Sequence, residues 1–264
     1  MLTETEPRAG IHATAIVDED VVLGDDVAIG PYCIVGPNVT LGDHTILDSH
    51  VCIQRDTTVG SDCHIHHGAV LGTDPQDLKF GGEQTRLVVG DRTVIREYAT
   101  LNRGTAARGR TVIGSDALLM AYSHVAHDCI IGNHVILSNA VNMGGHVEIG
   151  DWAIVGGLTA IHQFVRIGEH AFVGGASRVA KDVAPYVRAG GAPFVMAGLN
   201  SVGLRRRGFP QETRNQLKRA YRLMFKSNLN VTQALEKARA ELDVVPEVER
   251  FLRFFEESER GVSL

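Results

Sequence analysis

Aliphatic residues recur every six positions along most of the chain, from Ile11 to Val179. Of the 29 positions in this series, 26 are aliphatic, and the exceptions are Asp77, Glu83 and Ala107. A six-residue period fits neither an amphipathic helix nor a long strand. It is typical of short strands joined by tight corners, so that three hexads close one triangular coil of 18 residues.

A second series, four residues after each aliphatic position, holds small side chains in the regular hexads. It includes Cys33, Cys63 and Cys129, which we therefore interpret as packing residues. Glycine often follows the large aliphatic residue, as at Gly24, and we expect such glycines to adopt positive φ at the corners. Together the two series predict an all-β solenoid, a parallel β-helix whose coils stack about 4.8 Å apart.

Two segments interrupt the hexads without changing their phase, at residues 72–88 and 102–112. Loops on a rigid scaffold often carry binding residues, so we expect both to project from the β-helix. The series ends after Val179, and helical spacing predicts helices over about 210–227, 231–242 and 246–259. We therefore predict a β-helix over 1–190 and an α-helical C-terminal domain over 191–264, which caps the solenoid.

Charge is distributed unevenly over the 264 residues, whose formal net charge is −5. Residues 1–190 contain 13 basic and 22 acidic side chains, whereas residues 200–226 contain eight Lys or Arg and only Glu212 as an acid. The overall acidity argues against nucleic-acid binding, and the local basic cluster favours an acidic protein or a phosphate. No apolar stretch suits a membrane span, and the N-terminus lacks signal-peptide features, which predicts a cytoplasmic protein.

Four of the twelve histidines, namely His124, His127, His146 and His162, recur at spacings close to multiples of one coil. Stacking of the coils then predicts one column of imidazoles along a single edge. Such a column provides acid–base and hydrogen-bonding groups, although a solvent-facing polar ladder is the alternative. His66 and His67 lack a recognisable metal-binding frame, so we expect solvated side chains and no metal.

Several segments carry a more specific signal: HVAHD (124–128), MGGHVEIGD (143–151), GGLTAIHQF (156–164), PQDLKF (75–80) and GLNSVGLRRRGF (198–209). They resemble the UDP-N-acetylglucosamine acyltransferase family that opens lipid A synthesis. The resemblance covers nearly the whole chain and implies a left-handed β-helix. It also implies a homotrimer with active sites between neighbouring prisms. The implied reaction moves an R-3-hydroxyacyl group from acyl carrier protein to the 3-hydroxyl of UDP-N-acetylglucosamine, without a cofactor beyond the donor's phosphopantetheine arm.

The resemblance also assigns roles to residues. His127 becomes the general base, Asp128 orients its imidazole, and the Gly145 N–H binds the oxyanion. Because neighbouring strand residues point to opposite faces, the His127–Asp128 pair requires a corner. Substrate contacts map onto Asp77, Lys79, His124, His146, His162, Gln163, Asn200, Arg206 and Arg207, and the acyl-chain ruler maps onto Gly175, which implies a long 3-hydroxyacyl chain. The sequence departs from the family pattern at Val202, in place of an acid, and at Asn102, in place of a histidine.

Four alternatives share parts of this pattern. A glucosamine N-acyltransferase of the same pathway normally carries an extra N-terminal domain, whereas here the hexads begin by Ile11. A coenzyme A-dependent acetyltransferase does not explain the QDLKF and LRRRGF segments. A γ-type carbonic anhydrase uses three histidines on zinc, and a structural solenoid needs no histidine cluster.

Overall fold

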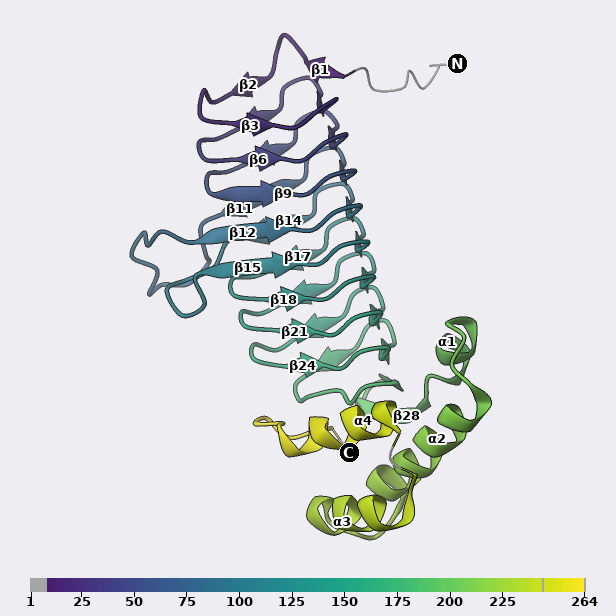
Figure 1. Cartoon of the computed structure of the whole chain (residues 1–264). Helices are drawn as coiled ribbons and strands as arrows, with labels where there is room; N and C mark the ends of the chain where they lie inside the picture. Colours follow the sequence, from purple (N-terminus) through teal and green to yellow (C-terminus); the bar gives the residue numbers. More distant parts are fainter. Residues whose placement is uncertain (1–8, 244, 264) are drawn as a thin grey trace.

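The computed structural model describes residues 9–243 and 245–263. Short strands stack coil upon coil into a triangular prism, and helices gather at its C-terminal end (Figure 1). The prism has three sheets of eleven, nine and eight strands, called here sheets A, B and C. All strand pairs are parallel except β27–β28, which is antiparallel.

The strands of each sheet follow in spatial order. Sheet A contains β1 (Gly10–Ile11), β4 (Ala28–Ile29), β7 (Ile46–Leu47), β10 (His64–Ile65), β13 (Val94–Ile95), β16 (Leu118–Leu119), β19 (Ile136–Leu137), β22 (Ile154–Val155), β25 (Phe172–Val173), β27 (Val187–Gly190) and β28 (Val195–Leu199). Sheet B contains β2 (Ile16–Val17), β5 (Ile34–Val35), β8 (Cys52–Ile53), β11 (Val70–Thr73), β14 (Thr100–Asn102), β17 (His124–Val125), β20 (Asn142–Met143), β23 (Ala160–Ile161) and β26 (Arg178–Val179). Sheet C contains β3 (Val22–Leu23), β6 (Thr40–Leu41), β9 (Thr57–Val59), β12 (Arg86–Val89), β15 (Arg110–Ile113), β18 (Ile130–Ile131), β21 (Glu148–Ile149) and β24 (Arg166–Ile167).

The six-residue aliphatic series forms the core of the prism, as predicted. From Ile29 to Val179 its aliphatic members are at most 4% exposed, whereas Ile11 in the first coil is 51% exposed because no earlier coil covers it. Cys33, Cys63 and Cys129 are buried and free, as their place in the small-residue series predicted. Burial raises the pKa of Cys129 to about 12, so this thiol stays protonated and acts as a packing group.

The corners differ from the prediction in one respect. The residues with left-handed φ are mostly not glycine, and Asp128, His146 and Trp152 are examples, at φ 59°, 62° and 63°. The glycines that follow the aliphatic positions serve close approach between coils instead. A Cβ on Gly150 would lie 2.6 Å from the backbone nitrogen of Glu169 on the next coil.

Each corner is named here by one of its residues. The His127 corner joins sheet B to sheet C and includes residues 127–128, 145–146 and 163–164. The Trp152 corner joins sheet C to sheet A and includes residues 133–134, 151–152 and 169–170. The Gly175 corner joins sheet A to sheet B and includes residues 139–140, 157–158 and 175–176.

Both inserted loops leave the prism where sheet B passes into sheet C, which is the His127 corner (Figure 1). They are shorter than predicted, since β11 and β12 leave only residues 74–85 outside strands, and β14 and β15 leave 103–109. The reason is that the flanking strands lengthen by pairing with each other, as in the four residue pairs of β12 with β15. The second loop therefore lies one coil before His127.

Four helices follow: α1 (Ser201–Arg206), α2 (Gln211–Lys226), α3 (Val231–Glu241) and α4 (Pro246–Glu256). The last three match the predicted helices closely, and α1 was not separately predicted. The boundary between residues 190 and 191 falls in the turn of the β27–β28 hairpin, so sheet A continues past it. Helix α4 lies beneath the last coils, where Phe254 contacts Arg166 (Figure 1). Within the described residues, no helix is long and apolar enough to cross a membrane.

Candidate active site

The predicted pair of His127 and Asp128 forms at a corner. Asp128 adopts φ 59°, and this turn brings its carboxylate back to the preceding imidazole. The Nδ1 atom of His127 lies 2.8 Å from Oδ2 of Asp128, whose side chain is fully buried. An ionised carboxylate can only accept a hydrogen bond, so Nδ1 carries the proton and Nε2 is left free to act as a base.

Thr105 from the second inserted loop holds the carboxylate in place. Its backbone N–H donates to Oδ1 of Asp128 at 2.9 Å, and its hydroxyl donates to Oδ2 at 2.6 Å. Burial alone would raise the pKa of Asp128, but the hydrogen bonds from Thr105 and His127 outweigh burial and lower it. Sequence reasoning missed Thr105, because a loop residue outside the six-residue period has no predictable neighbour.

His146 lies beside this pair on the next coil. Its Nε2 is 3.6 Å from Oδ2 of Asp128, and its ring meets the ring of His127 edge-on, with centroids 5.3 Å apart. Phe164, one coil further, stacks on His146 with a centroid distance of 4.5 Å and fixes the ring. Burial lowers the pKa of His146, which favours a neutral imidazole at neutral pH.

Gly145 lies directly against the imidazole of His127. A Cβ at this position would be 2.6 Å from Nε2, so only glycine leaves the imidazole where it is. The Gly145 carbonyl accepts a hydrogen bond from the Phe164 N–H at 3.0 Å. Its own N–H makes no hydrogen bond with another residue that the structure describes. An unpaired N–H beside a base is the donor that an oxyanion needs.

The prediction of a single imidazole column is wrong. Residues separated by a whole coil share a column, and His146 is offset by one position, so Gly145 rather than His146 stacks over His127. His124 lies on β17, where its Nδ1 shares a 2.7 Å hydrogen bond with the Thr100 hydroxyl, and burial lowers its pKa. His162 is exposed, and its Nδ1–H donates to the neighbouring carbonyl of Gln163 at 3.0 Å.

The first inserted loop carries Asp77 and Lys79 near this cluster. The Lys79 N–H donates to Oδ1 of Asp77 at 3.0 Å, while the Lys79 side chain is exposed. The negative charge of Asp77 acts on His146 and partly opposes the lowering of its pKa by burial. The loop therefore brings a carboxylate toward the predicted site.

Arg103 fastens the two loops together. It is 1% exposed, forms an ion pair with Asp74, and lies 5.5 Å from the centre of the Phe80 ring. Asn102 adds a hydrogen bond of 2.6 Å from its amide nitrogen to the Thr73 hydroxyl. A rigid first loop thereby supports the second loop, which in turn positions Asp128.

Three of the predicted substrate-binding residues, Asn200, Arg206 and Arg207, belong to the segment that packs at the Trp152 corner. The Asn200 side chain caps α1 by accepting from the Gly203 N–H at 3.2 Å, and donates to the His170 carbonyl at 2.9 Å. Arg207 donates to the Trp152 carbonyl at 2.9 Å. Arg206 is exposed. These residues are not brought to His127 within this chain.

Gly175 and Gln163 lie at two different corners. Gly175 belongs to the Gly175 corner, where a Cβ would lie 3.0 Å from the Gly157 carbonyl oxygen. Gln163 belongs to the His127 corner and is exposed. The predicted site residues are thus spread over all three corners of one prism.

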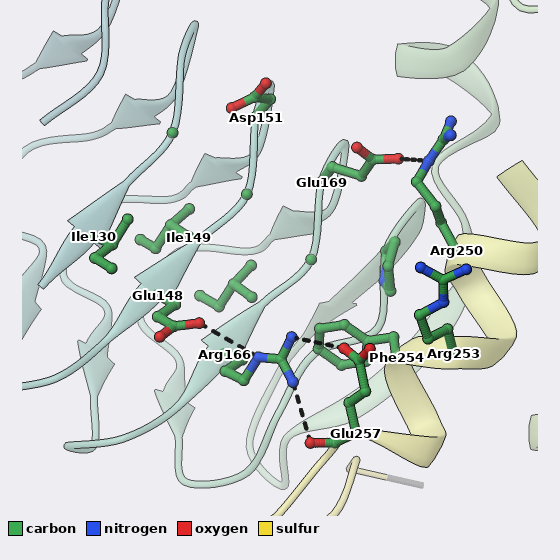
Figure 2. A pocket seen from close by; sticks show the side chains of 15 residues that line it. Ile130, Glu148, Ile149, Asp151, Arg166, Glu169, Arg250, Arg253, Phe254 and Glu257 are labelled. Carbon is green, nitrogen blue, oxygen red and sulfur yellow. Dashed lines mark hydrogen bonds and ion pairs between the residues drawn. The ribbon is translucent and has the colours of Figure 1, made fainter. Parts of the chain in front are cut away.

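A hollow of about 490 Å³ lies between α4 and strands β18, β21 and β24 (Figure 2). Arg166 crosses its edge and pairs with Glu148 at 3.5 Å and Glu257 at 3.4 Å. None of the predicted site residues lines it. A second hollow of about 510 Å³ shares these three residues and also contains His146 and Phe164, so it opens at the His127 corner.

His127, Asp128 and His146 also have ligand atoms within 4.8 Å of one another, as a metal site requires. The Asp128 carboxylate, however, already accepts hydrogen bonds from Thr105 and His127. The three-histidine zinc site of the carbonic anhydrase alternative is not formed by the residues that the structure describes. The cluster fits a hydrogen-bonded His–Asp base better than a metal centre.

A prism of hexapeptide repeats with a His–Asp pair at one corner defines a hexapeptide-repeat transferase. The family model for bacterial transferase hexapeptide repeats matches residues 110–144, and the model for domain 2 of UDP-N-acetylglucosamine O-acyltransferase matches residues 182–263. The chain belongs to the acyl-[acyl-carrier-protein]–UDP-N-acetylglucosamine O-acyltransferase family. This confirms the resemblance and the left-handed β-helix.

Relatives and solved structures agree over most of the chain. The chain is 62% identical to the acyltransferase of Chlorobium phaeobacteroides over 95% of this chain and 96% of that protein. It is 63% identical to that of Chlorobaculum tepidum over 93% of each. The LpxA structure from Acinetobacter baumannii superimposes with a TM-score of 0.94 at 46% identity, over 96% of this chain and 99% of that one. The LpxA structure from Bacteroides fragilis superimposes with a TM-score of 0.95 at 40% identity, over 97% of this chain and 100% of that one.

Proposed function

We propose that this protein transfers an R-3-hydroxyacyl group from acyl carrier protein to the 3-hydroxyl of UDP-N-acetylglucosamine, the first step of lipid A biosynthesis. The names of its close relatives support this reaction. The observation that carries the chemistry is the buried Asp128 carboxylate, which fixes the proton of His127 on Nδ1. Nε2 is thereby available to accept the proton of a sugar hydroxyl.

The reaction exchanges one acyl bond for another. As Nε2 of His127 takes the hydroxyl proton, the sugar oxygen attacks the thioester carbon and a tetrahedral oxyanion forms. The Asp128 carboxylate stabilises the resulting imidazolium. The carbon–sulfur bond then breaks, and the imidazolium returns its proton to the leaving thiolate of the phosphopantetheine arm. No further cofactor is needed for this balance.

Gly145 and His146 serve the same reaction in different ways. The Gly145 N–H, unpaired among the described residues, donates to the oxyanion. His146 stays neutral, so one ring nitrogen can donate and the other accept toward the sugar or the diphosphate. His124, His162 and Gln163, with Asp77 and Lys79 of the first loop, line the approach to this corner.

The proposal is tested by His127→Ala in an assay that follows 3-hydroxyacyl transfer to UDP-N-acetylglucosamine by mass spectrometry. Loss of a general base typically costs about 10²–10⁴ in rate. His44→Ala, an exposed histidine at another corner, is the matched control and keeps full turnover. Comparable turnover in both variants would contradict the assigned base.

The chemical nature of the product separates the O-acyltransferase from its N-acyltransferase sibling. An ester on the sugar is cleaved by hydroxylamine, whereas an amide resists it. We expect a hydroxylamine-sensitive product with UDP-N-acetylglucosamine. A product that forms only with an amino-sugar acceptor and resists hydroxylamine would establish the sibling activity instead.

The active form is a homotrimer, with each site between neighbouring prisms. The support is the spread of the predicted residues over three corners, with Arg206 and Arg207 far around the prism from His127. Sedimentation should give three times 28.5 kDa, and a fully active monomer would refute this assembly. We further propose that the trimer works in the cytoplasm, on an acyl group carried by a protein and on a nucleotide sugar.

The acyl carrier protein docks on the basic face of α2. Lys218 and Arg222 are exposed one helical turn apart, and neither forms an ion pair with a described residue. A positive patch steers an acidic partner. Reversing both charges should raise KM for the acyl-carrier donor and reduce its salt dependence, with little change for the sugar. The same reversal at Lys237 on α3 is the control, and equal effects from both sites would exclude this docking face.

A further inference from the structure

A second cluster of histidines lies away from the His127 corner, on the outer face of sheet A. Asp48 follows β7, His64 lies in β10, and His66 follows β10 on the next coil. Nε2 of His64 is 3.0 Å from Oδ1 of Asp48, and Nδ1 of His66 is 3.0 Å from Oδ2. One carboxylate thus faces two imidazoles at once, so His66 is not the solvated side chain that the sequence predicted.

The backbone explains why these three side chains meet. In a strand, residues two apart project from the same face, so His64 and His66 point outward together. The register of β7 with β10 stacks His66 directly over Asp48. The two rings are stacked with centroids 3.9 Å apart. The arrangement is therefore set by strand geometry rather than by a chance rotamer of one side chain.

The geometry of the cluster suits a metal ion. The three ligand atoms lie within 4.8 Å of one another. Tetrahedral bonds of about 2.0–2.1 Å to nitrogen and oxygen place ligand atoms about 3.3 Å apart, close to the 3.0 Å observed for each His–Asp contact. Two imidazoles and a carboxylate form a donor set that Zn²⁺ and Co²⁺ accept, with open positions left for water.

The surroundings also allow a cation. Arg96 lies one coil further in the same column as Asp48 and His66, but its guanidinium is paired with Glu97 at 2.9 Å. On the other side, the column continues with Gly30, which has no side chain to cover the cluster. All three ligand residues are partly exposed, with side-chain exposures of 35% for Asp48, 37% for His64 and 18% for His66, so an ion can reach them.

We propose that Asp48, His64 and His66 bind one divalent transition-metal ion, Zn²⁺ by its ligand preference, which cross-links two successive coils of the β-helix. The ion binds the two ring nitrogens that now face the carboxylate, and in each neutral imidazole the N–H proton moves through solvent from that nitrogen to the other one. The site is separate from the acyl-transfer cluster, since it lies on sheet A two coils earlier than His127. It has a practical consequence: a zinc content of one per chain does not by itself indicate a carbonic anhydrase.

The probe is Co²⁺, whose visible absorption reports coordination by nitrogen and oxygen ligands, together with calorimetric titration of Zn²⁺ into the full-length protein. We expect one ion per chain. Loss of one ligand in His64→Gln, His66→Gln or Asp48→Asn should weaken binding by roughly tenfold or more. His67→Gln is the matched control, because His67 is adjacent but bonds to Ser49 and Tyr98 instead.

His146→Gln tests the competing cluster at the His127 corner. Binding that survives His146→Gln and fails in the Asp48, His64 and His66 variants supports the proposal. Zn²⁺ binding that is lost only in His146→Gln overturns the proposal. Zn²⁺ binding that is weakened as much by the control His67→Gln as by the Asp48, His64 and His66 variants also overturns it. A measurement without ligand variants gives an independent check: Zn²⁺ should raise the melting temperature of His146→Gln, and an unchanged melting temperature would also overturn the site.

Discussion

Removing the Thr105 hydroxyl should impair catalysis without removing any group that touches substrate. Thr105→Val keeps the side-chain volume and the backbone N–H, so it deletes the 2.6 Å hydrogen bond to Oδ2 of Asp128 and the 3.2 Å bond that the hydroxyl accepts from the Ala107 N–H. That oxygen is also the one that faces His127 at 2.8 Å. The substitution therefore leaves the carboxylate held by one Thr105 bond instead of two.

The size of the effect follows from the charge of the acceptor. A hydrogen bond to an ionised group contributes about 1.5–3 kcal/mol, and an imidazole displaced by a fraction of an ångström loses its alignment with the attacking hydroxyl. We expect kcat to fall by roughly tenfold to a hundredfold, less than the loss expected for His127→Ala. The KM values for donor and acceptor should change little, because Thr105 orients the base and binds neither substrate.

Steady-state kinetics with saturating 3-hydroxyacyl carrier protein measures this effect. Thr105→Ser restores the hydroxyl and should recover most of the turnover. Thr45→Val is the stability control, since Thr45 is a buried threonine whose hydroxyl donates to the Gly60 carbonyl at 2.7 Å elsewhere in the prism. If Thr105→Val kept full kcat, or lost activity only through KM, Thr105 would not position the base.

Three further predictions concern Gly145, His170 and Gly175. Gly145→Ala should lower kcat by about 10²–10³, because its Cβ would lie 2.6 Å from Nε2 of His127 and disturb both base and oxyanion donor; near-normal kcat would weaken the oxyanion role. Burial and the neighbouring Arg207 lower the pKa of His170 from 6.5 to about 4, so the unfolded chain binds an extra proton between these values and stability falls as the pH drops through this window. After allowance for solvent screening, the loss of unfolding free energy between pH 7 and pH 5 amounts to about 1–2 kcal/mol. Urea unfolding at these two pH values should show a smaller loss for His170→Phe than for the unsubstituted protein. An equal loss in both proteins would contradict the role of His170 in this pH dependence. Gly175→Met should shift the preferred donor toward shorter 3-hydroxyacyl chains in a competition assay, and an unaltered preference would place the ruler elsewhere.

The sequence by itself determined the fold because its period is also the period of the coil. Each aliphatic residue of the series occupies the same place in its hexad, so one buried position predicts the next, from Ile29 to Val179. Gly145 follows His127 by 18 residues, which is one coil, so the same regularity accounts for its place against that imidazole. The corner at Asp128 was expected from strand geometry, because neighbouring strand residues point to opposite faces. The helices after Pro210 followed from their own spacing, since local apolar patterns decide where a helix forms.

Only the tertiary structure decided how the site is supported. The inserted loops break the constant spacing between coils, so no arithmetic along the chain could bring Thr105 to Asp128 or bury Arg103 between the loops. His146 also follows His127 by 19 residues, whereas one coil has 18. The two side chains therefore lie in neighbouring columns, which an approximate count of coils treats as one column. Repetition fixes neighbours one coil apart, whereas insertions and side-chain directions are settled by packing. The resemblance in the sequence could therefore point to His127 as the proposed base, but the threonine that holds the Asp128 carboxylate could not be found there.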